Sequence, residues 1–440
     1  MSKEYKDLCN WVIKQAKAAG ASDCKVSISK ERFVDINYRK KKPETIKEAS
    51  TQGLSLEIFM NGRYSSQSTP DLRKSTLETF IAKGCENTQF IEEDPFRSLP
   101  EKKYIEGKQE IDLYLYDNAV PELTTEKQHQ LAKEIEAACL DRGADKAISV
   151  EAGVNFSERE NTIIATNGFE DFTRTTDCNV GASMTAKGEG DRKPNGYYWV
   201  GGRHLSDLPE AQFIGKTAAD RTLQLIGGKK LETETLPVII ENRTVGRVLW
   251  GFLSALNGQN IQQQRSFLAD KKGELITSDK LSIVDNPLLV GGRNSKLVDY
   301  DGMPTKERKV ITNGVIDSYY FDWYYSRKMG VEPTTGSFSN LLFNQGNKNL
   351  EQLMQSAGRG ILITGFIGGN SNSTTGDFSI GIIGQLFENG VPVQAISEMN
   401  IADNHLEFWK KLVDTGNDPW KYGGWQTPSL LFDDIVVAGK

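Results

Sequence analysis

Histidine and cysteine, the side chains that most often hold a zinc ion, are scarce in this sequence. The chain has 440 residues but only three histidines (His129, His204 and His405) and five cysteines, the last of which is Cys178. Beyond residue 230, a site built from nitrogen and sulfur ligands would have His405 alone. Neither H-E-x-x-H nor G-x-S-x-G occurs. These counts leave little material for metal chemistry carried by this chain itself.

Serine chemistry is a second option. Ser254 or Ser379 could act as a nucleophile if His405 served as its base. No local spacing supports such a pair, so a metal-independent hydrolase is the least favoured hypothesis. The polar, glycine-rich tract Gly365–Gly376 could cradle a phosphate through its backbone amides. No Lys-Ser/Thr closes the tract, and a flexible or close-packed loop is expected there.

The overall charge is mildly acidic, with 53 Lys and Arg against 59 Asp and Glu and a formal net charge of −6. This balance argues against nucleic-acid binding, because neutralising phosphates requires clustered positive charge. The basic run Arg39–Lys42 is interpreted as a solvated hairpin tip or loop; the alternative, a site for an anionic partner, is not supported by the acidic total. The charged N-terminus predicts no secretory signal, and no apolar run approaches the ~18 residues of a membrane span. We therefore expect a cytoplasmic protein with free, buried thiols and no membrane segment.

Local patterns predict an α+β fold rich in antiparallel sheet. Asn61-Gly62, Asn313-Gly314 and Asn389-Gly390 are flanked by apolar residues and predict hairpins, because Asn-Gly accepts positive φ at both turn positions. Apolar residues at helical spacing predict a first helix that ends at Gly20 and a second that opens with the capping box Thr125-x-x-Gln128. Further helices are expected over about 71–84, 209–226, 243–257 and 350–358.

The first two helices reveal an internal repeat. In the first copy, a helix is followed by Gly20-Ala21-Ser22-Asp23 and then by a strand. The same order recurs with Gly143-Ala144-Asp145-Lys146 between a helix and a strand, at an offset of 143 − 20 = 123 residues. We predict two related helix–strands–helix units, as fixed-period self-similarity indicates. The predicted N-terminal α+β domain spans 1–230, with units at about 1–86 and 123–228 and a linker at 87–122. The remainder, 231–440, is predicted to be a β-rich, mostly antiparallel domain.

The predicted helix at 243–257 has a wide apolar face, and the segments after it resemble those of the TldD/PmbA family, in its PmbA/TldE branch. The similarity extends over nearly all of the chain. The segments that carry it are Ser266-Phe267-Leu268-Ala269-Asp270, Asp299-Tyr300-Asp301-Gly302, Ile311-Thr312-Asn313-Gly314-Val315, Tyr325–Gly330, Thr375-Gly376-Asp377-Phe378-Ser379, Glu388-Asn389-Gly390 and Ile401-Ala402. Their order and spacing together make the signature.

The resemblance implies a cytoplasmic proteolytic complex of two paralogous subunits that degrades unfolded or flexible polypeptides and trims leader peptides. In that family the metal-bearing, TldD-like subunit has H-E-x-x-x-H on this helix and a Cys ligand near its C-terminus. The matching positions in this chain hold Leu249, Trp250 and Ser254, and Trp420–Pro428 contains no Cys. Neither Leu nor Trp can bind zinc or act as a base. The resemblance thus implies the fold and the pathway, with no metal in this chain and zinc in a TldD-like partner.

We therefore predict a subunit without a metal, which completes a chamber and offers strand edges and apolar surface to an extended peptide. The predicted surface is the Gly-rich region 361–400, with the helix at 243–257 packed in the core behind it. The candidate peptide-binding residues are Thr375, Gly376, Asp377, Phe378 and Ser379. The dimer partner is a TldD-like paralogue or a second copy of this chain. The alternative is a stand-alone homodimer that binds peptides or another partner without catalysis. The family's older label, modulator of DNA gyrase, implies a link to gyrase, but no direct nucleic-acid binding is expected.

Overall fold

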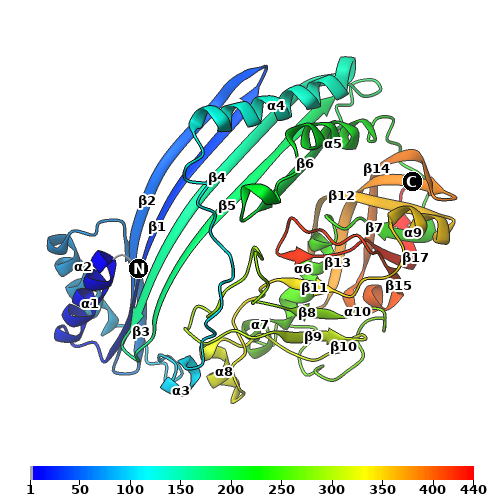
Figure 1. Cartoon of the computed structure of the whole chain (residues 1–440). Helices are drawn as coiled ribbons and strands as arrows, with labels where there is room; N and C mark the ends of the chain where they lie inside the picture. Colours follow the sequence, from blue (N-terminus) through cyan, green and yellow to red (C-terminus); the bar gives the residue numbers. More distant parts are fainter. Residues whose placement is uncertain (1–2) are drawn as a thin grey trace.

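One six-stranded antiparallel sheet organises the N-terminal part of the chain, in the order β3-β2-β1-β4-β5-β6. The computed structural model describes residues 3–440 (Figure 1). The strands are β1 (Asp23–Arg39), β2 (Lys42–Met60), β3 (Arg63–Thr69), β4 (Ala147–Ala165), β5 (Glu170–Ala186) and β6 (Asn195–Gly202). The four central strands have 17 to 19 residues each and form the long blue-to-green sheet of Figure 1.

The N-terminal part consists of two units that share one order: helix, three strands, helix. The first unit places β1–β3 between α1 (Lys3–Ala18) and α2 (Lys74–Thr88), and the second places β4–β6 between α4 (Thr125–Gly143) and α5 (Ala211–Leu223). The short helix α3 (Lys102–Ile105) lies in the segment between the units. Strand β1 pairs with β4 antiparallel, so the two units meet across a local two-fold axis. The predicted helix–strands–helix units are confirmed.

Both helix pairs cover the same face of the sheet. In β1, Val26 and Ile28 lie in a core with α1 and α2, whereas Val34 and Ile36 lie in a second core with α4 and α5. Residues an even number apart in a strand point to the same side, so both cores are on one face. The opposite face is left for the C-terminal part of the chain. The division into two domains near residue 230 stays a prediction. The N-terminal and C-terminal parts are the residues before and after that position.

The C-terminal part contains a sheet that closes on itself. Its order is β14-β13-β12-β7-β17-β15, and an additional pairing of β14 with β17 closes a barrel. These strands are β7 (Glu234–Ile240), β12 (Arg359–Ser371), β13 (Asp377–Glu388), β14 (Val391–Asn404), β15 (Leu412–Thr415) and β17 (Leu430–Ala438). Only the β7–β12 pairing among the described strands of this sheet is parallel. The prediction of a β-rich, mostly antiparallel C-terminal region is confirmed.

A smaller five-stranded sheet and several short helices complete the C-terminal part. The sheet contains β8 (Ile283–Asp285), β9 (Arg308–Thr312), β10 (Val315–Ile316), β11 (Leu341–Phe343) and β16 (Trp425–Gln426). The helices are α6 (Gly246–Leu253), α7 (Gly258–Gln262), α8 (Trp323–Met329), α9 (Leu350–Ala357) and α10 (His405–Phe408). None of the helices within residues 3–440 is long and apolar enough to cross a membrane.

The predicted turns are present, but two other sequence predictions are wrong. All three Asn-Gly pairs connect paired strands with positive φ at both residues, and the basic run forms the tip between β1 and β2. Helix α4 is capped by Thr124, whose hydroxyl accepts from the Lys127 amide, so the capping box at Thr125 is misplaced by one residue. Residues Gly365–Ser371 are the end of strand β12 rather than a loop, because they pair with β13.

Tyr300 of the C-terminal part contacts a buried ion pair that lies within the long sheet, between neighbouring strands β1 and β2. The Lys25 ammonium lies 2.9 Å from the Glu57 carboxylate, and the two side chains are only 4% and 8% exposed. Tyr300 of the C-terminal part donates its hydroxyl to Glu57, and its ring lies under the Lys25 ammonium. A buried pair is stable only when further hydrogen bonds satisfy its charges, and Tyr300 supplies them.

Candidate functional site

Helix α6 follows the central strand β7 and turns its apolar side into the barrel core. Val248, Leu249, Phe252 and Leu253 are buried there, as predicted for the apolar face of this helix. The three positions that the resemblance assigns to a metal motif have different surroundings. Leu249 is completely buried, Trp250 is 56% exposed, and Ser254 donates its hydroxyl to the Gly251 carbonyl. None of these side chains fits a zinc ion, because none is a strong donor at neutral pH.

Trp250 stacks on Trp425 of β16, with ring centroids 5.8 Å apart and planes at 21°. Phe338 packs edge-on against the ring of Trp425. The resemblance places metal ligands in the segments of Trp250 and Trp425, and the fold brings these segments into contact through aromatic rings. Among residues 3–440, no group of three or more His, Cys, Asp or Glu residues is arranged to hold a metal ion. The two segments therefore meet in a hydrophobic contact between aromatic rings.

The exposed side of α6 faces an unpaired edge of strand β12. Strand β12 pairs with β7 only through Ile361–Ile363. Beyond these residues it pairs with β13 alone among the described strands, with a break in the register at Gly368 and Gly369. Residues Ile367–Ser371 are exposed. The Arg247 guanidinium on α6 donates to the carbonyls of Gly368 and Gly369, at 3.2 Å each. An edge with free backbone groups can pair with an added strand.

The five predicted peptide-binding residues lie where β12 turns into β13. Thr375, Asp377 and Ser379 are exposed, whereas Phe378 is buried against His405 and Phe408. The Asn404 amide donates to the Thr375 carbonyl and to the Asp377 carboxylate, and this side-chain hydrogen bond lowers the pKa of Asp377. Phe378 is thus part of the core, and the other residues form a rigid turn at the far end of the open edge.

His405 is buried beneath α6 and hydrogen-bonded at both ring nitrogens. Its Nε2 lies 2.8 Å from the Ser371 hydroxyl, and its Nδ1 accepts from the Trp409 indole N–H at 3.2 Å. An indole N–H can only donate, so the neutral ring carries its hydrogen on Nε2 and donates it to Ser371. Burial lowers the pKa of His405 to about 4. This imidazole therefore cannot accept a proton from Ser371 at neutral pH.

The structure does not bring His405 to either serine that the sequence suggested. Ser379 donates to the Asn400 side chain at 3.3 Å, and Ser254 bonds to its own helix. Gly251 of α6 closes over the Ser371–His405 pair, since a Cβ there would lie 2.4 Å from the Ser371 hydroxyl. Sequence reasoning missed this pair because Ser371 is 34 residues from His405 and belongs to a tract assigned to a loop. The other two histidines, His129 and His204, lie in the N-terminal part.

Comparisons with known proteins agree with this architecture. The model described as the PmbA/TldA metallopeptidase central domain matches residues 118–226, and the corresponding C-terminal domain model matches residues 233–439. The metalloprotease PmbA of Escherichia coli O157:H7 is 27% identical over 428 residues, covering 96% of this chain and 94% of that protein. A PmbA homolog of Haemophilus influenzae is 25% identical, covering 100% and 97%.

Solved structures give the same result. A crystal structure of a proposed modulator of DNA gyrase from Bacteroides thetaiotaomicron has 35% identity and a TM-score of 0.96, and the match covers all of both chains. TldE from Thermococcus kodakarensis is similar in fold, with a TM-score of 0.87 at 17% identity, covering 98% of this chain and 100% of that one. The family models, the full-length relatives and the barrel with its α6 helix lead to one assignment. The chain belongs to the PmbA/TldD metallopeptidase family.

Proposed function

We propose that this chain is the subunit without a metal in a TldD/TldE-type peptidase, and that it holds an extended peptide for a metal-bearing partner. The observation that carries the proposal is the open edge of β12 beside the exposed side of α6. A peptide added to this edge would form main-chain hydrogen bonds that do not depend on its sequence. Such binding suits unfolded or flexible polypeptides and leader peptides, whose backbones are free to pair.

The side chains of α6 support the proposal that one paralogous subunit binds the metal and the other, this chain, binds the peptide. Leu249 and Trp250 provide neither a ligand nor a general base, so the metal, expected to be zinc, belongs to a TldD-like partner. In this chain the stacked Trp250 and Trp425 would instead form an apolar wall next to the bound strand. The turn at Thr375–Ser379 would flank its end. No cofactor of its own is proposed for this chain.

The assembly is proposed to work in the cytoplasm. All five cysteines are free and buried, and burial raises the pKa of Cys9, Cys24, Cys139 and Cys178 to about 12. Protonated, buried thiols are inert, and free thiols are typical of a reducing compartment.

The test is co-expression with a TldD-like paralogue that carries H-E-x-x-x-H, followed by cleavage of a flexible fluorogenic peptide. We expect a stable heterodimer that cleaves the peptide and loses activity with a chelator. The matched control is the same pair with the first His of the partner's motif replaced by Ala, which should form the heterodimer but cleave nothing.

Two outcomes would contradict the proposal. Chelator-sensitive cleavage by this chain alone would show that it holds its own metal. A stable homodimer with no affinity for the paralogue would favour the alternative of a stand-alone binding protein.

A further inference from the structure

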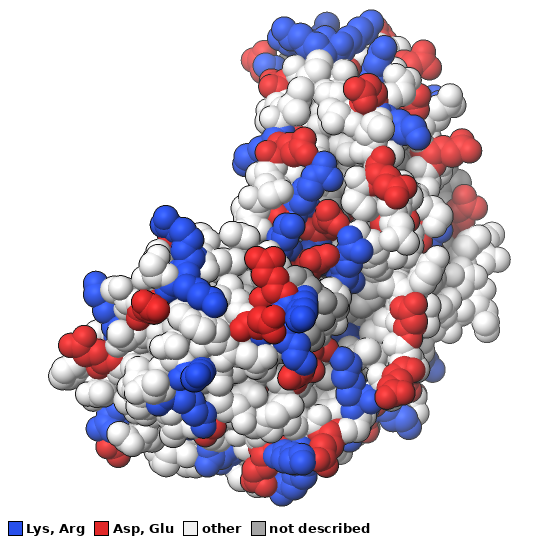
Figure 2. All heavy atoms as spheres, turned by 60° about the vertical axis from the view of Figure 1, so that its left-hand side comes forward, with Lys and Arg blue, Asp and Glu red and all other residues white. Residues whose placement is uncertain are grey.

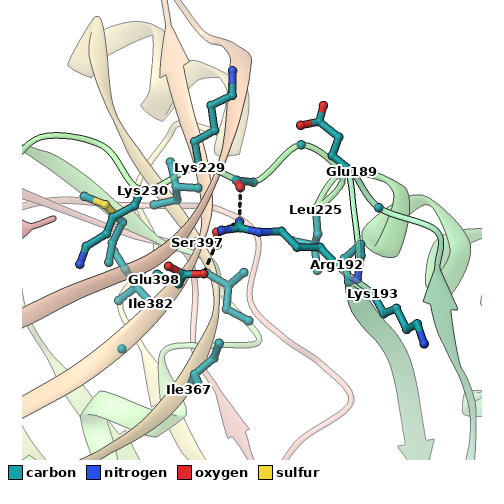
Figure 3. A pocket seen from close by; sticks show the side chains of 18 of the residues that line it. Glu189, Arg192, Lys193, Leu225, Lys229, Lys230, Ile367, Ile382, Ser397 and Glu398 are labelled. Atoms are coloured by element: carbon teal, nitrogen blue, oxygen red, sulfur yellow. Dashed lines mark hydrogen bonds and ion pairs between the residues drawn. The ribbon is translucent and has the colours of Figure 1, made fainter. Parts of the chain in front are cut away.

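A large cavity lies between the two parts of the chain, with a volume of about 1150 Å³ (Figure 3). Its walls are the loop 188–195 that connects β5 to β6, the connection 225–230, and the outer side of β12–β14. Small-molecule pockets usually measure ~300–1,000 Å³. This interdomain groove is therefore large enough for several residues of a peptide.

The floor of the interdomain groove is apolar and continues the open edge of β12. Ile367 lines the groove, is 57% exposed, and belongs to the stretch of β12 that has no strand on its other side. Its cross-strand partner in β13 is Gly381, where a Cβ would lie 2.7 Å from the Ile367 carbonyl oxygen. Leu225 adds apolar surface from the connection. An extended peptide on the β12 edge can therefore also enter this groove.

Arg192 holds the walls of the groove together. Its guanidinium donates to the Gly228 carbonyl at 2.6 Å, to the Ser397 hydroxyl at 3.1 Å and to the Glu398 carboxylate at 3.0 Å (Figure 3). Glu398 has a φ of 58° at a bulge in β14, and bulges re-aim side chains in this way. The positive charge of Arg192 is thus already balanced by Glu398.

Three lysines of the loop 188–195 and the connection 225–230 have no such partner. Lys193, Lys229 and Lys230 are exposed, and none lies within 4.0 Å of a carboxylate among residues 3–440. Figure 3 shows Lys193 leaving one wall and Lys229 and Lys230 leaving the other. The loop and the connection otherwise contribute one lining carboxylate, Glu189. This rim carries an excess of positive charge on a chain whose net charge is −6.

We infer that the interdomain groove selects acidic segments of a peptide, with apolar side chains on Ile367 and carboxylates among Lys193, Lys229 and Lys230. The inference rests on the proposed function, which supplies the peptide at the β12 edge. Complementary charge gives specificity and faster association more than raw affinity. Duplex DNA is a poorer fit, because its binding depends on many phosphate contacts, whereas this groove has few free cations above an apolar floor.

The experiment measures binding of three fluorescent peptides to the full chain by anisotropy. The peptides share one flexible sequence with leucines and differ only at three positions, which hold Glu, Gln or Lys. We expect the Glu peptide to bind at least about tenfold more tightly than the Lys peptide at low salt, and the difference to shrink as salt rises. The triple variant Lys193→Glu/Lys229→Glu/Lys230→Glu should lose this preference and bind the Gln peptide within about threefold of the wild type.

The matched control reverses three exposed lysines on the helices, Lys83→Glu/Lys133→Glu/Lys216→Glu, which changes the net charge equally. It should keep the preference for the Glu peptide. If no peptide binds the wild type, the proposed function fails. If the Gln peptide binds but Glu and Lys peptides bind equally, or if both triple variants lose the preference alike, only the groove inference fails. Lysine-dependent binding of duplex DNA as tight as that of the Glu peptide would also overturn it.

Discussion

His405 shows how its surroundings decide the chemistry of a single residue. Phe267 stacks on its ring with centroids 5.7 Å apart, and Phe378 packs against it at 4.8 Å, so the ring is desolvated. Asp403 opposes the effect of burial only weakly, and the pKa stays near 4. A histidine next to a serine could be taken for a catalytic pair. Here the indole N–H of Trp409 donates to Nδ1 of His405, which fixes the tautomer whose Nε2–H donates to Ser371. We therefore assign a structural role, and not a catalytic one, to the hydrogen bond between His405 and Ser371 beneath α6.

Acidification should destabilise the protein through His405. Because its pKa is about 4 in the folded state and 6.5 in a free histidine, the unfolded chain takes up the proton first. The free energy of unfolding should fall by about 3 kcal/mol between pH 6.5 and pH 4, with no contribution above pH 7. Urea unfolding of the wild type and of His405→Gln at pH 7.5, 5.5 and 4 measures this difference.

The comparison with the variant matters because Asp299 acts in the opposite direction. Burial, together with the charge of Asp301, raises the pKa of Asp299 to about 7. Its contribution to stability therefore falls as pH rises from about 4 to 7, which masks the effect of His405 in the wild type alone. A difference between wild type and His405→Gln that does not change with pH would refute the assignment.

At the scale of elements, the sequence predicts what is local. Asn61-Gly62, Asn313-Gly314 and Asn389-Gly390 form their hairpins because a two-residue turn is decided by its own backbone. The apolar face of α6 follows from its helical spacing. The open edge of β12 and the contact of Trp250 with Trp425 could not be predicted in this way. Both depend on where β7 and β16 lie, which is decided by packing between distant segments.

The open edge can be tested through Arg247. This side chain occupies the carbonyls of Gly368 and Gly369, so a peptide that pairs there must displace it. We expect Arg247→Ala to bind the Gln peptide about two to five times more tightly, since an exposed hydrogen bond contributes roughly 0.5–1 kcal/mol. Arg265→Ala, another exposed arginine with no side-chain hydrogen bond or ion pair among the described residues, is the control and should leave binding unchanged. Weaker binding by Arg247→Ala would mean that the guanidinium contacts the peptide instead.

On the scale of the whole molecule, the long sheet is attached to the C-terminal part at two separate places. Lys25, Glu57 and Tyr300 join them at one end of the sheet, and Arg192 joins them across the interdomain groove. The Lys25 and Glu57 side chains are buried, whereas those of Arg192 and Glu398 are about half exposed. Burial makes a charge pair sensitive to the loss of either partner, whereas an exposed pair contributes little. Loss of either partner of the buried pair, on which Tyr300 rests, is thus expected to destabilise the protein more than loss of Arg192.

A double-mutant cycle on Lys25 and Glu57 tests the buried pair that Tyr300 contacts. Lys25→Met and Glu57→Gln should each lower the free energy of unfolding by roughly 3–5 kcal/mol, because each leaves or disturbs an uncompensated buried group. The double variant should cost less than the sum of the two. Tyr300→Phe, which removes only the hydroxyl donated to Glu57, should cost about 1 kcal/mol. Urea unfolding measures all four, and single variants within ~0.5 kcal/mol of the wild type would show that the pair is not needed for stability.

The antiparallel seam between β1 and β4 has an evolutionary consequence. A single helix–strands–helix unit that formed a symmetric dimer through its first strand would build the same seam. Joining two copies of that unit's gene in tandem would convert the contact between two molecules into the middle of one chain. Each copy could then diverge, since the connecting segment keeps both together. The two units differ in what lies beside their second strands, β2 and β5. The Leu115 carbonyl of the segment 106–117 accepts a hydrogen bond from the backbone amide of Thr176 in β5. In the first unit, the part of β2 before Gly53 has no strand beside it other than β1 among the described residues.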